Sequence, residues 1–177
     1  MVYLSGSRKD DRNYIGVGFI VAPWAKTAVI TFHAVTERIG SLRLKVPGGT
    51  LTILSVYAPH DKHPFEDRHQ FFSDVVAHTK SDTKHHATMV LGDFNAKLGC
   101  VMVGEENMIG EHVFYCPLTG GNTSLSNRSL LIELCVAKKL VIANTYFDHP
   151  DENKVTYRGI TTKQNRLFLA VGLCIMS

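Results

Sequence analysis

The sequence has few cysteines, no long apolar run and no strong excess of charge of one sign, and each absence excludes a class of protein. Only four of the 177 residues are cysteines, and they form no Cys-x-x-Cys pair, which argues against a zinc knuckle or a dense disulfide framework. We therefore expect a reduced, intracellular protein. The longest apolar run, residues 167–176, is about half of the ~20 residues that a membrane-spanning helix needs. The N-terminal residues lack the apolar core of a secretory signal, so we expect no membrane partner.

The remaining composition is that of a globular domain. Hydrophobic residues make up 45% of the chain and charged residues 20%, which argues against a disordered or fibrous protein. At roughly 150 residues per domain, the length predicts about one domain. Lys and Arg number 19 against 16 Asp and Glu. This mild positive excess permits phosphate binding but does not establish it, because a nucleic-acid surface depends on where the positive charges cluster.

Strand-like segments dominate the first third of the chain. Residues 41–46 alternate between apolar and polar or charged side chains, as a half-buried strand does. The Pro-Gly-Gly-Thr run at 47–50 is typical of a turn, and residues 51–57 return as the partner strand of an antiparallel hairpin. Two further strands are predicted nearer the N-terminus, at 15–22 and 28–32.

Helical spacing follows in two later segments. A helix over 65–79 would collect its apolar residues on one face. A second helix is predicted at about 126–139, where Lys138 and Lys139 suit the negative end of the helix dipole. The other predicted elements are buried strands at 87–91 and 140–144, a short strand at 154–158 and a long surface loop over 99–125. This order predicts sheet layers flanked by helices.

The most specific signal is a pair of motifs that each end a predicted strand. Residues 55–59 read Ser-Val-Tyr-Ala-Pro, and residues 90–95 read Val-Leu-Gly-Asp-Phe-Asn. Taken alone, Gly-Asp-x-Asn is compatible with a simple turn, since Asp and Asn bond their own backbone and Gly accepts a positive φ. Tyr57 alone is compatible with a half-buried aromatic residue.

Together the motifs resemble the endonuclease/exonuclease/phosphatase superfamily, in which one strand ends in Tyr-x-Pro and a later one in Gly-Asp-x-Asn. The order of further segments is similar to retrotransposon-type endonucleases and to proteins of the craniofacial development protein 2 type. The resemblance predicts a partial domain over residues 14–165, with non-matching ends at 1–13 and 166–177. It implies an α+β fold, a partial four-layer α/β/β/α sandwich with two mostly antiparallel sheets flanked by helices.

The chemistry that this resemblance implies is Mg²⁺-dependent hydrolysis of a phosphodiester, with DNA as the partner. Asp93 would orient or activate the attacking water, and Asn95 would donate its amide to a phosphate oxygen. Tyr57 would bring its hydroxyl to the phosphate or to the metal's surroundings. Thr156 would contact the substrate in the same pocket, and the alternative interpretation of that position is an ordinary strand residue.

Several family residues have no match in this chain. Nothing before Tyr14 resembles the family's strand with a metal-binding glutamate, and residues 161–173 lack the later aspartate and the Ser-Asp-His motif. A shifted frame, an alternative exon and a decayed element copy all remain open as causes. Since Asp93 is the one matched carboxylate, the metal ligands stay unknown. We expect weak Mg²⁺ binding and weak or absent activity.

Histidines and competing functions leave further alternatives open. Six histidines lie within a short stretch, but their spacing fits no compact zinc site: His60, His63, His69, His78, His85 and His86. We expect them to be solvated. Besides a weak or inactive endonuclease of retrotransposon origin, with the nucleus as its compartment, two functions remain: a phosphomonoesterase or lipid-headgroup phosphatase, and a non-catalytic interaction domain on the same fold. The sequence identifies no protein partner.

Overall fold

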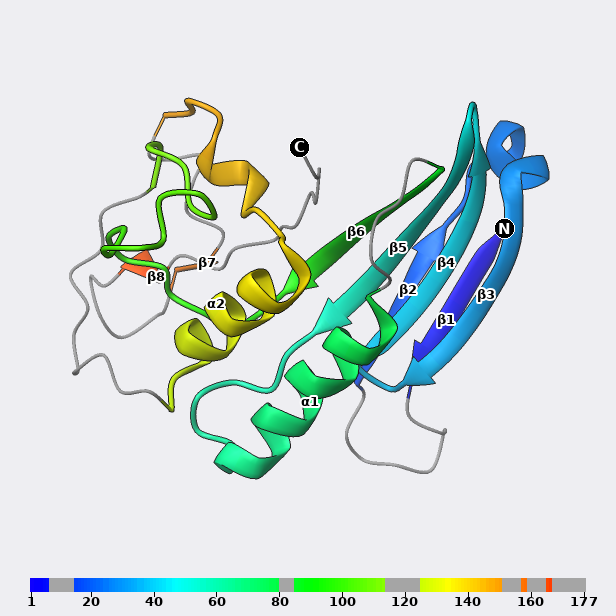
Figure 1. The fold of residues 1–177 in the computed structure, drawn as a ribbon. Helices are drawn as coiled ribbons and strands as arrows, with labels where there is room; N and C mark the ends of the chain where they lie inside the picture. The colour runs from blue at the N-terminus through cyan, green and yellow to red at the C-terminus, as the bar shows by residue number, and fades with distance from the viewer. Residues whose placement is uncertain (7–14, 80–84, 114–124, 151–156, 159–164, 167–177) are drawn as a thin grey trace.

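The computed structural model describes residues 1–6, 15–79, 85–113, 125–150, 157–158 and 165–166. Its elements follow one another from the N-terminus as Figure 1 shows: β1 (Val2–Gly6), β2 (Gly16–Ile20), η1 (Pro23–Ala28), β3 (Val29–Thr36), β4 (Ile39–Val46), β5 (Gly49–Tyr57), α1 (Phe65–His78), β6 (His86–Asp93), α2 (Asn127–Lys138), η2 (Ala143–Thr145), β7 (Tyr157–Arg158) and β8 (Asn165–Arg166). None of the helices in these residues is long and apolar enough to cross a membrane.

The central element is a four-stranded sheet in the order β3-β4-β5-β6. β3, β4 and β5 are antiparallel neighbours, and the predicted hairpin joins β4 to β5. β6 instead runs parallel to β5, which requires a crossover, and α1 lies in that connection. A second, two-stranded sheet pairs β1 with β2 in antiparallel register.

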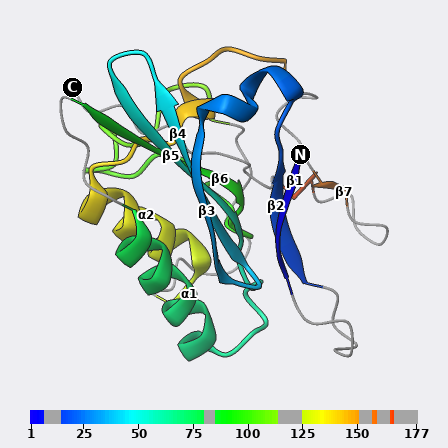
Figure 2. The ribbon, with the colours of Figure 1, turned by 90° about the vertical axis from the view of Figure 1, so that its right-hand side faces the viewer.

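These elements form layers. Figure 2 shows α1 and α2 on one side of the four-stranded sheet and the β1–β2 sheet on the other. The two sheets contact each other through aromatic side chains. The ring centroid of Phe32 lies 5.2 Å from that of Tyr3 and 6.2 Å from that of Phe19. The observed fold is therefore of the α+β class: the four-stranded and the β1–β2 sheets lie face to face and one helix layer covers the larger sheet, as in a partial α/β/β/α sandwich. β7 and β8 pair as a further two-stranded sheet.

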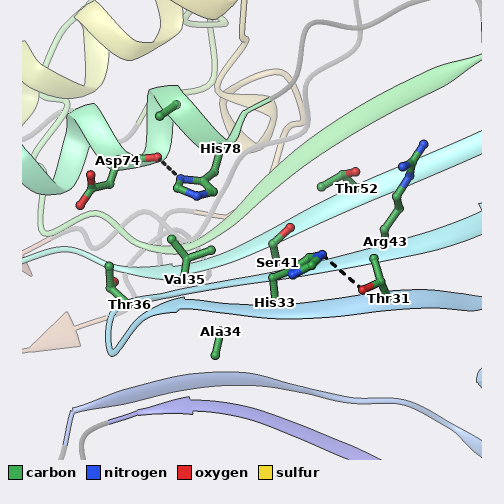
Figure 3. A pocket seen from close by; sticks show the side chains of 11 residues that line it. Thr31, His33, Ala34, Val35, Thr36, Ser41, Arg43, Thr52, Asp74 and His78 are labelled. Carbon is green, nitrogen blue, oxygen red and sulfur yellow. Dashed lines mark hydrogen bonds between the residues drawn. The ribbon is translucent and has the colours of Figure 1, made fainter.

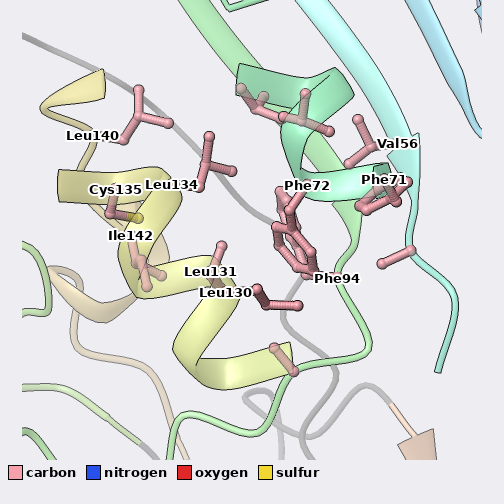
Figure 4. Packing of buried hydrophobic residues seen from close by; sticks show 14 of the residues in the cluster. Val56, Phe71, Phe72, Phe94, Leu130, Leu131, Leu134, Cys135, Leu140 and Ile142 are labelled. Atoms are coloured by element: carbon pink, nitrogen blue, oxygen red, sulfur yellow. The ribbon is translucent and has the colours of Figure 1, made fainter. Parts of the chain in front are cut away.

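The main core fills the space between the four-stranded sheet and the two helices. Leu54, Val56 and Val90 point from the sheet toward Phe72 of α1 and Leu134 of α2, and all five are at most 3% exposed. Figure 4 shows this packing, with Phe94 stacked near Phe72 at the end of β6. Burial of this cluster is the main force that holds the helices on the sheet.

Several expectations differ from the structure. Residues 140–144 form no strand: Ile142 makes a single bridge to Ile109, and η2 follows at once, because the Thr145 side chain bonds the Ile142 carbonyl and turns the chain. The predicted surface loop at 99–125 is partly interior, since Ile109 is 2% exposed; residues 114–124 lie outside the described part. β1 was not among the predicted strands, and its pairing with β2 is a tertiary contact.

Candidate active site

The two motif strands end side by side. β5 and β6 are parallel, and their register pairs Tyr57 directly with Asp93. Paired residues in neighbouring strands project from the same face of a sheet. Leu54 and Val56 alternate toward the helices, so Tyr57 and Asp93 emerge at the carboxyl edge with Tyr57 38% exposed and Asp93 partly buried.

Short hydrogen bonds hold the two strand ends together. The Ala58 N–H donates to the Asp93 carbonyl (2.8 Å), and the Asn95 side-chain amide donates to the Ala58 carbonyl (2.7 Å). The Asn95 backbone N–H donates to Asp93 Oδ1 (2.8 Å). Tyr57, Asp93 and Asn95 are thus brought together, and Thr156 lies outside the described residues. The Asn95 amide was expected to donate to a phosphate. One of its two N–H groups instead donates to the Ala58 carbonyl of the neighbouring loop.

Backbone geometry explains why the Gly-Asp-x-Asn motif has glycine at position 92 and asparagine at position 95. Gly92 has φ of 148°, and a Cβ there would lie 1.9 Å from the Val56 carbonyl oxygen. Only glycine lets the two strands approach this closely. Asn95 has φ of 48°, in the left-handed region that Asn adopts more readily than most residues. Both residues therefore serve the turn as well as any chemistry.

The Asp93 carboxyl binds a proton more tightly than an exposed aspartate does. Burial raises the pKa of Asp93 above its ordinary value, and the hydrogen bond from the Asn95 N–H opposes that rise. A carboxylate with a raised pKa is a better proton acceptor near neutral pH than an exposed one.

Arg38 is a neighbour of the site that the sequence pattern did not reveal. It lies in the β3–β4 turn, where its carbonyl accepts from the Tyr57 N–H (2.9 Å). Its Nη1 donates to the Tyr57 carbonyl (3.2 Å), and its guanidinium carbon stands 5.4 Å from the Tyr57 ring centroid. The Arg38 cation is thereby fixed against the exposed tyrosine. Only strand register shows this contact, because 19 residues separate the two positions.

Two of the six histidines also lie near this edge. The rings of His60 and His63 are 4.3 Å apart. Burial lowers the pKa of His63, and the nearby charges of His60 and Arg38 add to that decrease. His63 therefore holds a proton less readily than an ordinary histidine, and Arg38 is the permanent cation beside Tyr57.

One buried side chain connects both motif loops. Asn127, at the start of α2, is 0% exposed, and its amide nitrogen donates to the Pro59 carbonyl (2.8 Å) and, more weakly, to the carbonyls of Phe94 and Asn95 (3.3 Å each). Its Oδ1 accepts from Arg68 of α1 (3.2 Å). Asn127 thereby sets the spacing between the loops that carry Tyr57 and Asp93. An asparagine after the capping Ser126 carries no sequence signal of this role.

A buried ion pair supports the chain beyond Asn95. Arg128 Nη1 and Nη2 donate to the two carboxylate oxygens of Glu105, at 2.7 and 2.5 Å. The Arg128 guanidinium also donates to the Leu98 and Cys100 carbonyls. Burial by itself would raise the pKa of Glu105. The hydrogen bonds from Arg128 and the Met102 N–H, together with the Arg128 charge, outweigh burial and lower it.

The described residues offer limited donors for a divalent cation. Mg²⁺ is usually held by one or two carboxylates together with waters and a substrate phosphate. Asp93 supplies one carboxylate at the strand ends, and nowhere in the described residues do three or more His, Cys, Asp or Glu side chains gather as a metal site requires. The donor set fits Mg²⁺ only in its minimal form, with the substrate phosphate as a further ligand.

Comparison with known proteins adds a relative. No family model matches the chain. The chain is similar to craniofacial development protein 2. It is 29% identical to the Bos taurus protein over 160 residues, which is 88% of the chain, and equally similar to the Tragulus javanicus protein. The chain spans about a quarter of the length of these relatives, 24% and 25%. The expected resemblance to this type of protein is confirmed.

Proposed function

We propose that this chain is a phosphodiester hydrolase domain of the endonuclease/exonuclease/phosphatase type, with DNA as substrate, a retrotransposon origin and weak Mg²⁺-dependent activity. One observation carries the proposal: Tyr57 and Asp93 stand in register at the carboxyl ends of two parallel strands. The resemblance of both motifs and the similarity to craniofacial development protein 2 support it.

The chain's own residues would divide the work of hydrolysis as follows. The Asp93 carboxylate orients the attacking water and accepts its proton, which its raised pKa favours. The Tyr57 hydroxyl donates to a phosphate oxygen, and the second N–H of the Asn95 amide is available for the same phosphate. Arg38, fixed over Tyr57, neutralises a phosphate charge. A bound Mg²⁺ would neutralise charge on the phosphate and on the leaving oxygen.

The small number of carboxylates makes weak activity the expected result. Asp93 must serve both the water and the metal in the described residues, and loss of one acid or base group alone lowers rates by about 10² to 10⁴. This same observation favours a second candidate, a non-catalytic domain that binds DNA through the Arg38 guanidinium beside Tyr57.

A nicking assay tests the proposal. Purified protein, supercoiled plasmid and Mg²⁺ should give slow nicking that chelation stops. Asp93→Asn should abolish it, whereas Glu133→Gln, which removes an exposed carboxylate from α2, should leave it unchanged. Nicking that survives Asp93→Asn would refute the assignment, and fast turnover would refute weak activity.

Binding measurements separate the second candidate from the first. The non-catalytic DNA-binding function would be supported, and the hydrolase function refuted, by three results together. The protein would bind DNA with an affinity that falls steeply with salt, the affinity would decrease in Arg38→Gln, and no nicking would be seen. Since DNA is the proposed substrate, the proposal also predicts a nuclear location, which a fluorescent fusion would test.

A further inference from the structure

A cavity of about 640 Å³ lies on the opposite side of the four-stranded sheet from Tyr57 and Asp93. Its floor is formed by β3, β4 and β5, and its other wall by the C-terminal half of α1, where Asp74 and His78 face it (Figure 3). This volume is within the range of about 300 to 1,000 Å³ that small-molecule sites occupy.

The floor of the cavity is polar where a sheet covered by a helix is normally apolar. On the same sheet face, Leu54 and Val56 form core near the carboxyl end of β5. Toward the other end, the lining residues from the strands include Thr31, Ser41, Arg43 and Thr52. Thr52 is only 3% exposed, so its hydroxyl is an interior group and not a solvated one.

Two polar atoms of this floor lack partners. Arg43 Nε and Thr52 Oγ1 are closed off from solvent and have no hydrogen-bond partner among the described residues. The Arg43 guanidinium makes one long contact, from Nη2 to Thr50 Oγ1 (3.5 Å), and no described carboxylate lies within ion-pair distance of it. A partly buried cation without a counter-ion is costly, so the floor favours an anion.

The charges of the cavity are separated along its length. Figure 3 shows Arg43 at one end and Asp74 at the other. Asp74 Oδ1 accepts from Gln70 (2.9 Å) and the Asp74 carbonyl is 2.8 Å from His78 Nδ1, so α1 holds its acidic end in place. His33 lies between the ends, with its ring 3.3 Å from Thr31 Oγ1. An anionic group fits the Arg43 end, and hydroxyl or amino groups that donate to a carboxylate fit the Asp74 end.

We propose that this cavity binds a small phosphate monoester, with the phosphate on Arg43 and the hydroxyls of Thr31 and Thr52, and the organic part toward Asp74. Guanidinium groups bind phosphate through paired charge-assisted hydrogen bonds, which are stronger than neutral ones. Arg43 turns toward the ligand to make them, which also gives its unpartnered Nε an acceptor. The site is separate from the Tyr57–Asp93 edge, so it does not depend on the function proposed above.

Calorimetric titration of the 177-residue protein tests the site with three probes. Adenosine 5′-monophosphate should bind, inorganic phosphate should bind more weakly, and adenosine should not bind, which would identify an organic phosphate as the ligand. Equal affinity for inorganic phosphate and the nucleotide would overturn the claim that the organic part is recognised. Binding of adenosine alone would overturn the phosphate site.

Matched variants locate the binding. Arg43→Gln should weaken the nucleotide by about ten- to a hundredfold, whereas Lys45→Gln, which removes an exposed charge two residues along β4, should change it less than twofold. Asp74→Asn should tighten the inorganic phosphate by removing a like charge. Asp93→Asn should leave both affinities unchanged, so failure of the proposed hydrolase and of this site are distinguishable. Equal losses in Arg43→Gln and Lys45→Gln, with both variants folded by melting, would overturn the proposal.

Discussion

At the carboxyl ends of β5 and β6, buried polar side chains are bonded to main-chain groups, whereas under α1 two buried polar atoms have no partner. Asn127 fills the first region with donors to three carbonyls. Arg43 Nε and Thr52 Oγ1 lie unpaired in the second. The first arrangement fixes a geometry, which a catalytic edge needs, and the second leaves unsatisfied donors, which a ligand can satisfy.

The largest expected effect comes from the paired region. Glu105→Gln leaves the Arg128 charge buried without its counter-ion, and breaking such a pair lowers the free energy of unfolding by about 3 to 5 kcal/mol. Urea denaturation at pH 7 measures the loss. The exposed neighbour variant Glu106→Gln is the control, and an equal loss in both would show that the pair has no special role.

The same pair gives a pH dependence. Since the folded pKa of Glu105 is lowered from 4.5, its contribution to stability is present above that value and is lost as the pH falls through the lower, folded value. The difference between wild type and Glu105→Gln should therefore shrink in acid. A difference that stays constant from pH 7 to pH 3 would contradict this assignment.

Asn127→Ala should have the next largest effect, a loss of about 2 to 3 kcal/mol, because buried carbonyls and one Arg68 N–H lose their partner. Its DNA-nicking rate should fall as well, since the loops of Tyr57 and Asp93 lose their common support. Thermal melting and the nicking assay measure both effects. Asn107→Ala, at an exposed position, should change neither.

A smaller effect of opposite sign is expected at Asp93. Its raised folded pKa means that its favourable contribution is present below the ordinary value of 3.8 and is lost as the pH rises through the raised value. Asp93→Asn should thus be slightly more stable than wild type at pH 7 while losing activity. A destabilised variant would contradict this, because it would show that the hydrogen bond from the Asn95 N–H stabilises the charged carboxylate more than burial disfavours it.

The smallest effect sharpens the description of the unpaired region. Thr52→Val replaces an unpartnered buried hydroxyl with a methyl group and should raise the free energy of unfolding by up to about 1 kcal/mol. Thr50→Val removes a hydroxyl that lies 2.7 Å from His86 Nδ1 and should lower it. Melting without phosphate measures both, and a loss in Thr52→Val would mean that its hydroxyl is bonded.

Local patterns predicted most elements of this protein and failed where distant contacts decide. The alternation in 41–46 and the spacing in 65–79 correspond to β4 and α1, because burial of one face acts within each segment. Residues 140–144 are as apolar as a buried strand. They form no strand because only Ile142 pairs with a neighbouring segment and the chain turns at Thr145. A local sequence pattern cannot show whether a partner strand is available for pairing.

The sequence, through the resemblance of its two motifs to a known superfamily, was sufficient to propose Tyr57, Asp93 and Asn95 as one candidate site, because each motif lies within a few consecutive residues at the end of a strand. Three features required the folded chain: the contact of Arg38 with Tyr57, the hub at Asn127 and the cavity beside Arg43. Each joins segments that are far apart in sequence. Their contacts depend on strand register and helix packing, which arise from burial summed over the whole core and not from any one segment.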